Sequence, residues 1–310
     1  MYIVDSHCDS IQQVDIRRHG IVNPYNYSNK HQQLQFVAAF CSWPGDDAEK
    51  CFRRAVRYIG HFKLRMEIEK DKVEQVYTYA DIERAFAAGK HAALLTIEGG
   101  TGIVGSAQVF RDFYAAGVRV FGMTWLCNDL CASTRRDNGE DDYGLTDLGR
   151  EIIEVGNELG MIFDVSHMSD KSFWDVAPLV KKPIIATHSN FRALCGHPRN
   201  LTDDMTREII RQGGMIGLNF YPKFICDDPA ESDIAALLRH LEYCLSLGGE
   251  NNIGFGGDVD GTSGKYPKGL DETCSIHDRI IEYMLSHNYS EELVRKVAGE
   301  NYLNFLKKYL

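Results

Sequence analysis

Eight short apolar runs, most of them followed by a stretch with helical periodicity, constrain the fold more than any other feature of this sequence. The runs are Tyr2–His7, Phe36–Ser42, Ala92–Ile97, Val118–Trp125, Met161–His167, Pro183–His188, Met215–Phe220 and Ile253–Asp258. They are rich in Val, Ile, Leu and Phe without polar alternation, which is typical of strands buried on both faces of a parallel sheet. Eight such strands alternating with helices predict an α/β protein with the fold of a (β/α)8 TIM barrel.

The length of 310 residues would allow two domains at about 150 residues each. The strand pattern instead favours one barrel over residues 1–310, with its eight strands within 2–258 and extra C-terminal helices at 276–310. The helices expected between strands are Ala48–Glu69, Asp81–Ala88, Ala107–Ala116, Asp147–Leu159, Asp170–Leu179, Asp203–Gln212 and Ser232–Leu247. Long segments follow several strands, at Asn128–Thr146, Tyr221–Glu231 and Thr262–Ser275. Functional groups are therefore expected at the carboxyl ends of the strands.

Charge and cysteine content narrow the class of protein. The chain has 34 Lys and Arg against 44 Asp and Glu, a net charge of −10, and no basic stripe that would displace counterions from nucleic acid. Its 9 cysteines lack the dense spacing of a disulfide scaffold, and its first residues lack the pattern of a signal peptide. We therefore expect a cytoplasmic protein with no nucleic-acid partner and no membrane anchor.

Side chains that can bind metal stand at the ends of several predicted strands. His7 and Asp9 share one face where the first strand ends, Glu98 ends the third strand, His167 the fifth and His188 the sixth. Imidazole and carboxylate groups are costly to bury unless they bind something. These are the ligand types of a divalent-metal site, and five ligands exceed the three or four that one catalytic zinc takes from protein. Two metal ions are expected, bridged by the carboxylate of Glu98.

Single residues of this kind carry little weight, because a lone histidine at a strand end is more often structural than a ligand. The combination around the barrel favours metal, and Asp258 adds a carboxylate at the end of the eighth strand. Asp5 and Asp164 are expected to orient ligands or to cap loops. Surface or core positions are expected for His19, His31, His61, His91, His240, His277 and His287, and ordinary thiols for Cys127 and Cys131.

Taken together, the motifs resemble those of the membrane (renal) dipeptidases, which are binuclear zinc peptidases of the amidohydrolase type. The resemblance rests on Asp5-Ser6-His7-Cys8-Asp9, Ile97-Glu98-Gly99-Gly100, Asp164-Val165-Ser166-His167, Thr187-His188-Ser189, Arg199-Asn200 with Asp203-Asp204, and the glycine-rich segment 254–261. It implies that His7, Asp9 and Glu98 hold one zinc ion, and that Glu98, His167 and His188 hold the other.

The resemblance also implies roles for residues around the metal. Arg199 matches the arginine that pairs with the terminal carboxylate of the substrate, a role suited to a bidentate guanidinium. Tyr221 matches a tyrosine that contacts substrate, and Asp258 matches the aspartate that carries protons in catalysis. Trp125 departs from the pattern, because the family has at this position a histidine thought to stabilise the oxyanion. Since indole cannot carry charge, Trp125 predicts a different substrate preference or slower turnover.

The predicted function is that of a hydrolase in proteolysis, a zinc-dependent metallo-dipeptidase. A water molecule bridging the two ions would attack the peptide carbonyl as hydroxide, while Asp258 passes its proton to the leaving amine. Two alternatives stay open: hydrolysis of another small amide, lactam or ester at the same dizinc site, and a non-catalytic metal-binding or sensor protein. A homodimer is the candidate assembly that the resemblance implies.

Overall fold

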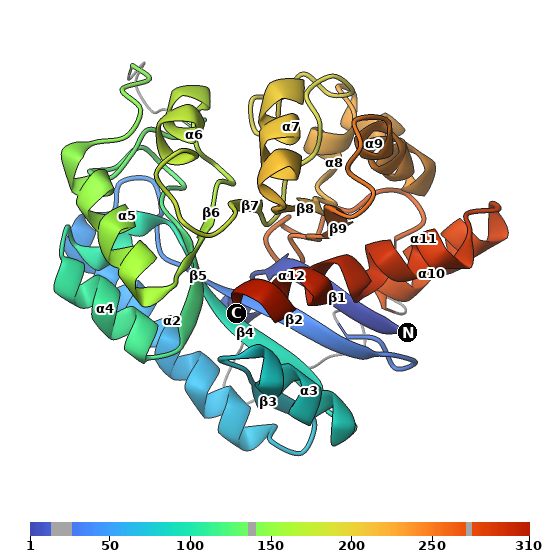
Figure 1. The fold of residues 1–310 in the computed structure, drawn as a ribbon, viewed down its shortest axis with the longest axis horizontal. Helices are drawn as coiled ribbons and strands as arrows, with labels where there is room; N and C mark the ends of the chain where they lie inside the picture. The colour runs from blue at the N-terminus through green and yellow to red at the C-terminus, as the bar shows by residue number, and fades with distance from the viewer. Residues whose placement is uncertain (14–26, 136–140, 271–274) are drawn as a thin grey trace.

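The strands form a closed parallel barrel with helices around it (Figure 1). The computed structural model describes residues 1–13, 27–135, 141–270 and 275–310. Within these residues the barrel strands are β1 (Tyr2–Cys8), β2 (Gln32–Phe40), β4 (His91–Glu98), β5 (Val118–Gly122), β6 (Ile162–Asp164), β7 (Ile185–Ala186), β8 (Met215–Leu218) and β9 (Ile253–Phe255). The barrel closes because β2 pairs in parallel with both β1 and β4. The predicted (β/α)8 TIM barrel is confirmed.

One short strand, β3 (Val73–Gln75), lies outside the eight predicted ones. Its three residues pair in parallel with β4 from His91 to Ala93, whereas β5 pairs with the same edge of β4 only from Leu95 onward. The strand therefore extends the sheet beside the start of β4 and leaves the barrel closed.

The seven helices predicted between the strands are all present, with small shifts at their ends. They are α2 (Ala48–Ile68), α3 (Tyr79–Ala87), α4 (Ala107–Ala115), α5 (Asp147–Leu159), α6 (Asp170–Val176), α7 (Asp203–Gln212) and α9 (Ile234–Ser246). Shorter pieces are α1 (Ser10–Gln13), η1 (Gly100–Ile103), α8 (Pro222–Ile225) and η2 (Pro229–Glu231), and the chain continues through α10 (Ile276–Ser286), α11 (Glu291–Arg295), η3 (Lys296–Glu300) and α12 (Asn301–Tyr309). Capping explains the sharp starts: the side chains of Thr146, Ser169 and Thr202 accept hydrogen bonds from the first turns of α5, α6 and α7.

The inner face of the barrel is apolar toward the amino ends of the strands. A single buried cluster there takes residues from seven of the barrel strands: Val4, Phe36, Leu94, Val120, Ile162, Ile185 and Met215. Tyr302 of α12 belongs to the same cluster, and its ring centroid lies 5.9 Å from that of Phe36. In Figure 1, α12 lies across β1 and β2. The helix therefore covers the amino end of the barrel, and the carboxyl end is left for function.

An irregularity in β1 decides which of its side chains reach the carboxyl end. The register between β1 and β2 shifts between Asp5 and Cys8. Before the shift Val4 packs in the inner cluster, and after it Cys8 packs in the outer one. Because such a bulge re-aims side chains, His7 faces the barrel mouth although it is out of step with Val4. His7 and Asp9 share a face there, as their spacing predicts.

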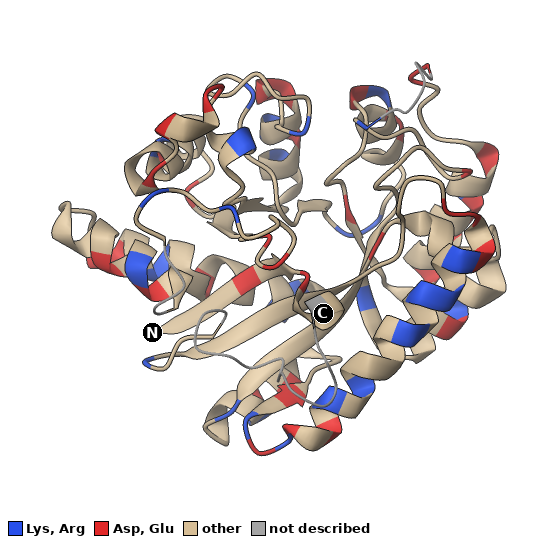
Figure 2. Cartoon of the chain, turned by 180° about the vertical axis from the view of Figure 1, so that it is seen from behind, with Lys and Arg blue, Asp and Glu red and all other residues tan. Residues whose placement is uncertain are grey.

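Charged residues lie mainly on the helices and loops, and most of each strand is free of them (Figure 2). Among the residues that the structure describes, no helix combines the length and the apolar character needed to cross a membrane. Parts of two long segments predicted after strands, 136–140 and 271–274, lie outside the described residues. The third, Tyr221–Glu231, carries α8 and η2 beside the carboxyl end of β8.

Candidate active site

A cavity of about 590 Å³ opens at the carboxyl end of the barrel. Most predicted site residues line it: Asp9, Glu98, Trp125, His167, Arg199, Tyr221 and Asp258. The other two, His7 and His188, are buried next to it, with only 2% and 1% of their surface exposed. The structure thus brings together residues spread from β1 to the segment after β9.

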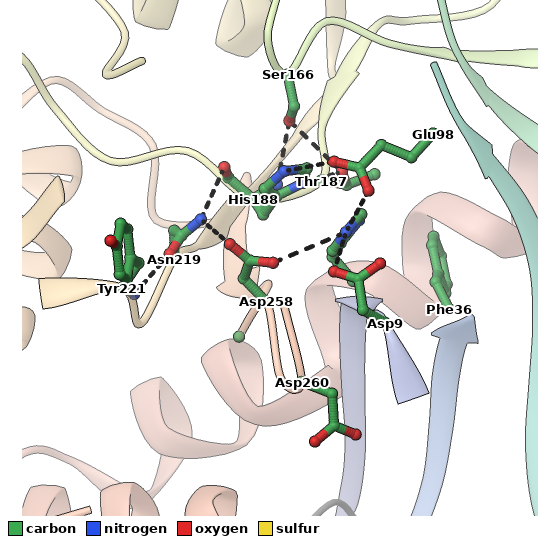
Figure 3. Close-up of polar contacts among 12 residues, drawn as sticks. Asp9, Phe36, Glu98, Ser166, Thr187, His188, Asn219, Tyr221, Asp258 and Asp260 are labelled. Atoms are coloured by element: carbon green, nitrogen blue, oxygen red, sulfur yellow. Dashed lines mark hydrogen bonds and ion pairs between the residues drawn. The ribbon is translucent and has the colours of Figure 1, made fainter. Parts of the chain in front are cut away.

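Glu98, at the end of β4, faces different predicted ligands with its two carboxylate oxygens (Figure 3). Its Oε1 lies 2.9 Å from His167 Nε2 and 3.6 Å from His188 Nε2. Its Oε2 lies 3.4 Å from His7 Nε2, which is in turn 3.7 Å from Asp9 Oδ2. The two oxygens of Glu98 thus face different ligands, and the rings of His7 and His188 also lie 3.8 Å apart, so the five predicted ligands form one continuous cluster.

The residues present fit a divalent cation. His7 Nε2 is buried, and no residue that the structure describes makes a hydrogen bond with it. Ligand atoms of His7, Glu98 and His188 all lie within 4.8 Å of one another, and so do those of His7, Asp9 and Asp258. Imidazole nitrogens and carboxylate oxygens are the ligands that catalytic zinc takes. The donor set is therefore suitable for zinc.

The electrostatics of the cluster also suit a cation. Burial lowers the pKa of His167 to about 3 and the pKa of His188 well below its ordinary value, so both rings are neutral at pH 7 and have a lone pair to offer. Burial acts in the same direction on His7, but the carboxylates of Glu98 and Asp9 together outweigh it and raise the pKa of His7 well above its ordinary value. His7 therefore holds a proton that a metal ion must displace.

Asp258 reaches the mouth from a tight turn, three residues beyond the end of β9, and not from the strand itself. Its backbone has a φ of 55°, a strained value for aspartate. A Cβ at Gly261 would lie 2.1 Å from Asp9 Oδ2 and 2.2 Å from Asp258 Oδ1, so any other residue here would have to displace both carboxylates. Burial raises the pKa of Asp258 to about 8, and the neighbouring carboxylates of Asp9 and Glu98 act in the same direction. The group can therefore exchange a proton near neutral pH.

A hydroxyl group fixes the orientation of His188. Thr187 Oγ1 lies 2.5 Å from Asp164 Oδ2 and 2.8 Å from His188 Nδ1. The single hydroxyl proton is donated to the carboxylate, so Thr187 Oγ1 accepts from the Nδ1–H of His188. This leaves Nε2 of His188 without a proton and directed toward Glu98. Asp164, expected to orient a ligand, acts here through Thr187.

Asp5 joins three parts of the chain behind the site. Its carboxylate accepts hydrogen bonds from the backbone N–H groups of His7 at 2.9 Å and Gly257 at 3.1 Å. His277 Nε2 of α10 lies 2.5 Å from the same carboxylate, and both side chains are fully buried. His277 is thus a core residue, one of the two places expected for it. The contact holds β1 and the turn that leads to Asp258 at a fixed separation.

Arg199 lies at the other side of the cavity and is buried. Its guanidinium donates to Ser189 Oγ at 3.2 Å and to the backbone carbonyl of His188 at 3.0 Å. Its Nε is buried and makes no hydrogen bond with the described part of the chain. A buried guanidinium with donor capacity to spare suits a carboxylate. Tyr221 lies on the same side, next to Phe224 at a ring distance of 5.0 Å.

Two residues without a predicted role also belong to the site. Asn219, just after β8, is fully buried and donates from Nδ2 to Asp258 Oδ2 at 3.2 Å (Figure 3). A polar residue directly after an apolar strand is the signal that could have identified it. His197 lines the cavity, and its Nδ1 accepts from the backbone N–H of Arg199 at 3.1 Å. It lies in a long loop, where no periodicity marks it.

Three aromatic side chains form a further part of the cavity wall. We call Phe40, Trp43 and Trp125 the aromatic wall. The ring of Phe40 lies 5.1 Å from Trp43 and 5.0 Å from Trp125, and the two indoles are 6.2 Å apart. Trp125, the position that departs from the family pattern, also lies 5.9 Å from the ring of His167. The guanidinium of Arg135 stands 4.5 Å from the centre of the Trp125 ring.

Comparison with known proteins gives consistent matches. Residues 1–309 match the family described as membrane dipeptidase (Peptidase family M19). An uncharacterised protein of the pqqA 5′ region in Klebsiella pneumoniae is 37% identical over 235 residues, which are 74% of this chain and 86% of that protein.

Solved structures are similar over the whole chain. A metallo peptidase from Rhodobacter sphaeroides, crystallised with a phosphinate mimic of the dipeptide L-Ala-D-Ala, is similar with a TM-score of 0.88 and 25% identity over 100% of this chain and 99% of that one. The dipeptidase AC, a metallo peptidase of family M19, gives a TM-score of 0.88 and 27% identity over 100% of this chain and 98% of that one.

Proposed function

This chain is a metallo-dipeptidase of the membrane dipeptidase family (Peptidase family M19), and on that premise we propose which of its residues hold metal and carry the reaction. Two zinc ions would be held, one by His7, Asp9 and Glu98 and the other by Glu98, His167 and His188. The observation that carries this proposal is that Glu98 Oε1 faces His167 and His188 while its Oε2 faces His7. When bound, the ions polarise the scissile carbonyl and lower the pKa of the attacking water.

Asp258 is the group that moves the proton in this proposal. Its carboxyl group lines the cavity, and its Oδ1 lies 4.0 Å from His7 Nε2 at the edge of the ligand cluster. Asn219 holds the other oxygen in place. From this position Asp258 accepts the proton of the attacking water and delivers it to the amine that leaves, which is general acid–base catalysis.

Arg199 orients the substrate by its terminal carboxylate. The guanidinium is held by Ser189 and by the backbone of His188, so it is fixed close to a metal ligand before substrate arrives. Because this cation is fixed beside the proposed metal ligands, it favours dipeptides with a free terminal carboxylate over longer peptides. Tyr221 contacts the same half of the substrate from the segment after β8.

The test uses zinc-loaded protein and a panel of dipeptides. The panel includes L-Ala-D-Ala, because a phosphinate mimic of that dipeptide is bound in the Rhodobacter sphaeroides relative. Asp258→Asn is expected to lower kcat by about 10²–10⁴-fold, the usual contribution of a general acid–base group, with two zinc ions still bound. Hydrolysis at the wild-type rate by Asp258→Asn would remove Asp258 from the mechanism. Dipeptide amides lack the terminal carboxylate, so they should be hydrolysed more slowly than the free dipeptides if Arg199 binds that group.

Trp125 supports a second candidate reaction at the same site, the hydrolysis of another small amide, lactam or ester. Its indole lies beside His167, where a charged oxyanion donor is expected from the family pattern. Trp125→His distinguishes the two reactions. A gain of activity on dipeptides in this variant supports the second candidate. If the variant gains no activity on any dipeptide, the missing oxyanion donor is not what sets the substrate preference.

We also propose a cytoplasmic location and a homodimeric assembly. Among the described cysteines none forms a disulfide, and Cys8, Cys41, Cys51, Cys131, Cys195 and Cys244 are buried thiols, which persist in a reducing compartment. The homodimer rests on the resemblance to the family alone. Cell fractionation tests the first proposal, and size-exclusion chromatography with light scattering tests the second.

A further inference from the structure

We propose that the aromatic wall of Phe40, Trp43 and Trp125 is the subsite for the side chain of the substrate's N-terminal residue, and that the enzyme prefers dipeptides beginning with an aromatic or large apolar residue. This proposal rests on the proposed function, because it takes the direction of the bound dipeptide from Arg199. It adds a substrate class that the metal ligands alone do not define.

The order of strands places two members of the aromatic wall, Phe40 and Trp43, across the barrel from Arg199. Phe40 ends β2, and Trp43 follows it in sequence, while Arg199 follows β7. In the closed barrel β2 and β7 are four strands apart in either direction, through β1, β9 and β8 or through β4, β5 and β6. Both groups line the same cavity. A dipeptide whose carboxylate binds Arg199 therefore extends toward the aromatic wall.

The aromatic wall begins next to the reacting centre. Phe40 and Glu98 are directly paired residues of β2 and β4. Trp125 contacts His167, whose Nε2 lies 2.9 Å from Glu98 Oε1. With the scissile carbonyl at Glu98 and its neighbours, the next side chain on the acyl side lies against these rings. That side chain belongs to the N-terminal residue of a dipeptide.

The rings form an apolar surface that is incomplete without an occupant. Phe40 is 4% exposed, but Trp43 is 47% exposed although its ring contacts the other two. The three rings meet at interplanar angles of 62° to 90°, the edge-to-face arrangement that aromatic groups prefer. A ring from the substrate can join this arrangement and cover the exposed indole, which removes apolar surface from water.

Charge in the aromatic wall argues against a basic occupant. The guanidinium of Arg135 already lies over the Trp125 ring, at 4.5 Å, and lines the cavity. A lysine or arginine side chain of the substrate would find the face of the Trp125 ring already occupied by a cation. The aromatic wall therefore favours neutral apolar side chains over basic ones.

The experiment compares kcat/KM of the zinc-loaded enzyme for Phe-Ala, Leu-Ala, Ala-Ala, Asp-Ala and Lys-Ala. We expect Phe-Ala to exceed Ala-Ala by at least about tenfold, the discrimination that an added apolar group brings in a fitted pocket, and Lys-Ala to be the poorest. Trp43→Ala is expected to reduce the ratio of Phe-Ala to Ala-Ala by about tenfold, and Trp43→Phe to restore most of it.

The matched control is Trp174→Ala. Trp174 of α6 is 45% exposed, close to the 47% of Trp43, and it does not line the cavity. The control makes the same chemical change at the same exposure, so its ratio of Phe-Ala to Ala-Ala should equal that of the wild type. An equal fall of the ratio in both variants would overturn the subsite.

Further outcomes separate the subsite from the proposed function. Equal kcat/KM for Phe-Ala and Ala-Ala, or a preference for Asp-Ala, overturns the subsite and leaves the dipeptidase in place. If no dipeptide is hydrolysed, calorimetric titration of the zinc-loaded protein with Phe-Ala and Ala-Ala decides. Tighter binding of Phe-Ala then supports the subsite while the proposed function fails, and equal binding overturns the subsite as well.

Discussion

The two ends of the barrel interior are built by the same strands, but the side chains buried at one end are apolar and those buried at the other are ionisable. On β4, Leu94 packs in the apolar cluster at the amino end and is fully buried. Glu98, four residues later on the same inner face, is only 6% exposed and lies among imidazoles. Burying Leu94 stabilises the fold directly, whereas burying Glu98 costs free energy unless a cation compensates. Stability and function should therefore respond to different substitutions along one strand.

The largest effect is expected from Glu98→Gln. The amide cannot offer an anionic oxygen to each of two cations, so dipeptide hydrolysis should fall by at least about 10³-fold, as expected when a group essential to the reaction is removed. Metal analysis should find fewer than two zinc ions per chain. Two bound ions together with near-normal turnover would show that the carboxylate of Glu98 does not bridge them.

Leu94→Ala tests the other end of the same strand. A cavity beside Phe36 and Tyr302 should lower the free energy of unfolding by about 3 kcal/mol, which urea denaturation of the metal-free protein measures. Zinc content and kcat of the folded protein should stay near those of the wild type. If Leu94→Ala loses zinc as Glu98→Gln does, the two ends are not separable.

Most strands were predictable because they are continuous apolar runs, buried on both faces. Glu98 was predictable for the same reason, since a carboxylate directly after such a run stands out. The strand predicted at Phe36–Ser42 is instead Gln32–Phe40, because its first residues include three buried or half-buried glutamines that break the apolar run. β3 was not predictable, because it has only three residues and pairs only with the first residues of β4, on the edge that β5 joins further along. The bulge in β1 was not either, since it is a shift in the pairing of β1 with β2, a strand that lies more than twenty residues away in the sequence.

A smaller effect, on metal affinity, is expected from Thr187→Val, a change at a residue that contacts the ligand His188. The variant keeps the shape of the side chain but removes the hydroxyl between Asp164 and His188. Loss of such an orienting contact lowers metal affinity by about 10–100-fold, which competition with a chelator measures. Thr187→Ser keeps the hydroxyl and should restore the affinity. Equal affinities in all three proteins would contradict an orienting role.

The smallest effect concerns pH. Because the pKa of His7 is raised, its ring keeps its proton to a higher pH than an ordinary histidine, and zinc must displace that proton. Zinc affinity should therefore rise with pH, by about tenfold per unit for the release of one proton, as long as the pH stays below the pKa of His7. Calorimetry in buffers of different ionisation enthalpy counts the protons released. In His7→Asn the count should fall by one, and an unchanged count would assign the proton to another group.

The aromatic wall shows why part of the site escapes prediction from sequence. Phe40 and Trp125 lie on segments 85 positions apart, and they meet because β2 and β5 both flank β4 when the barrel closes. Trp43 looks like an ordinary loop residue in the sequence, and only its contacts with the other two rings give it a place in the cavity. Contacts across the mouth of the barrel form because the sheet closes, and no local sequence pattern predicts which residues then meet.

The helix over the amino end of the barrel has a consequence for synthesis on the ribosome. The hydroxyl of Tyr302 donates a hydrogen bond to Ser6, across 296 positions of the chain. β1 leaves the ribosome before the other strands of the barrel, yet Val4 and Ser6 cannot be covered by Tyr302 until α12 has emerged. Since domains fold as their chains emerge during synthesis, a nascent chain that stops short of α12 exposes the apolar inner layer. Completion of the apolar layer at the amino end therefore depends on a helix that emerges only after all eight strands of the barrel.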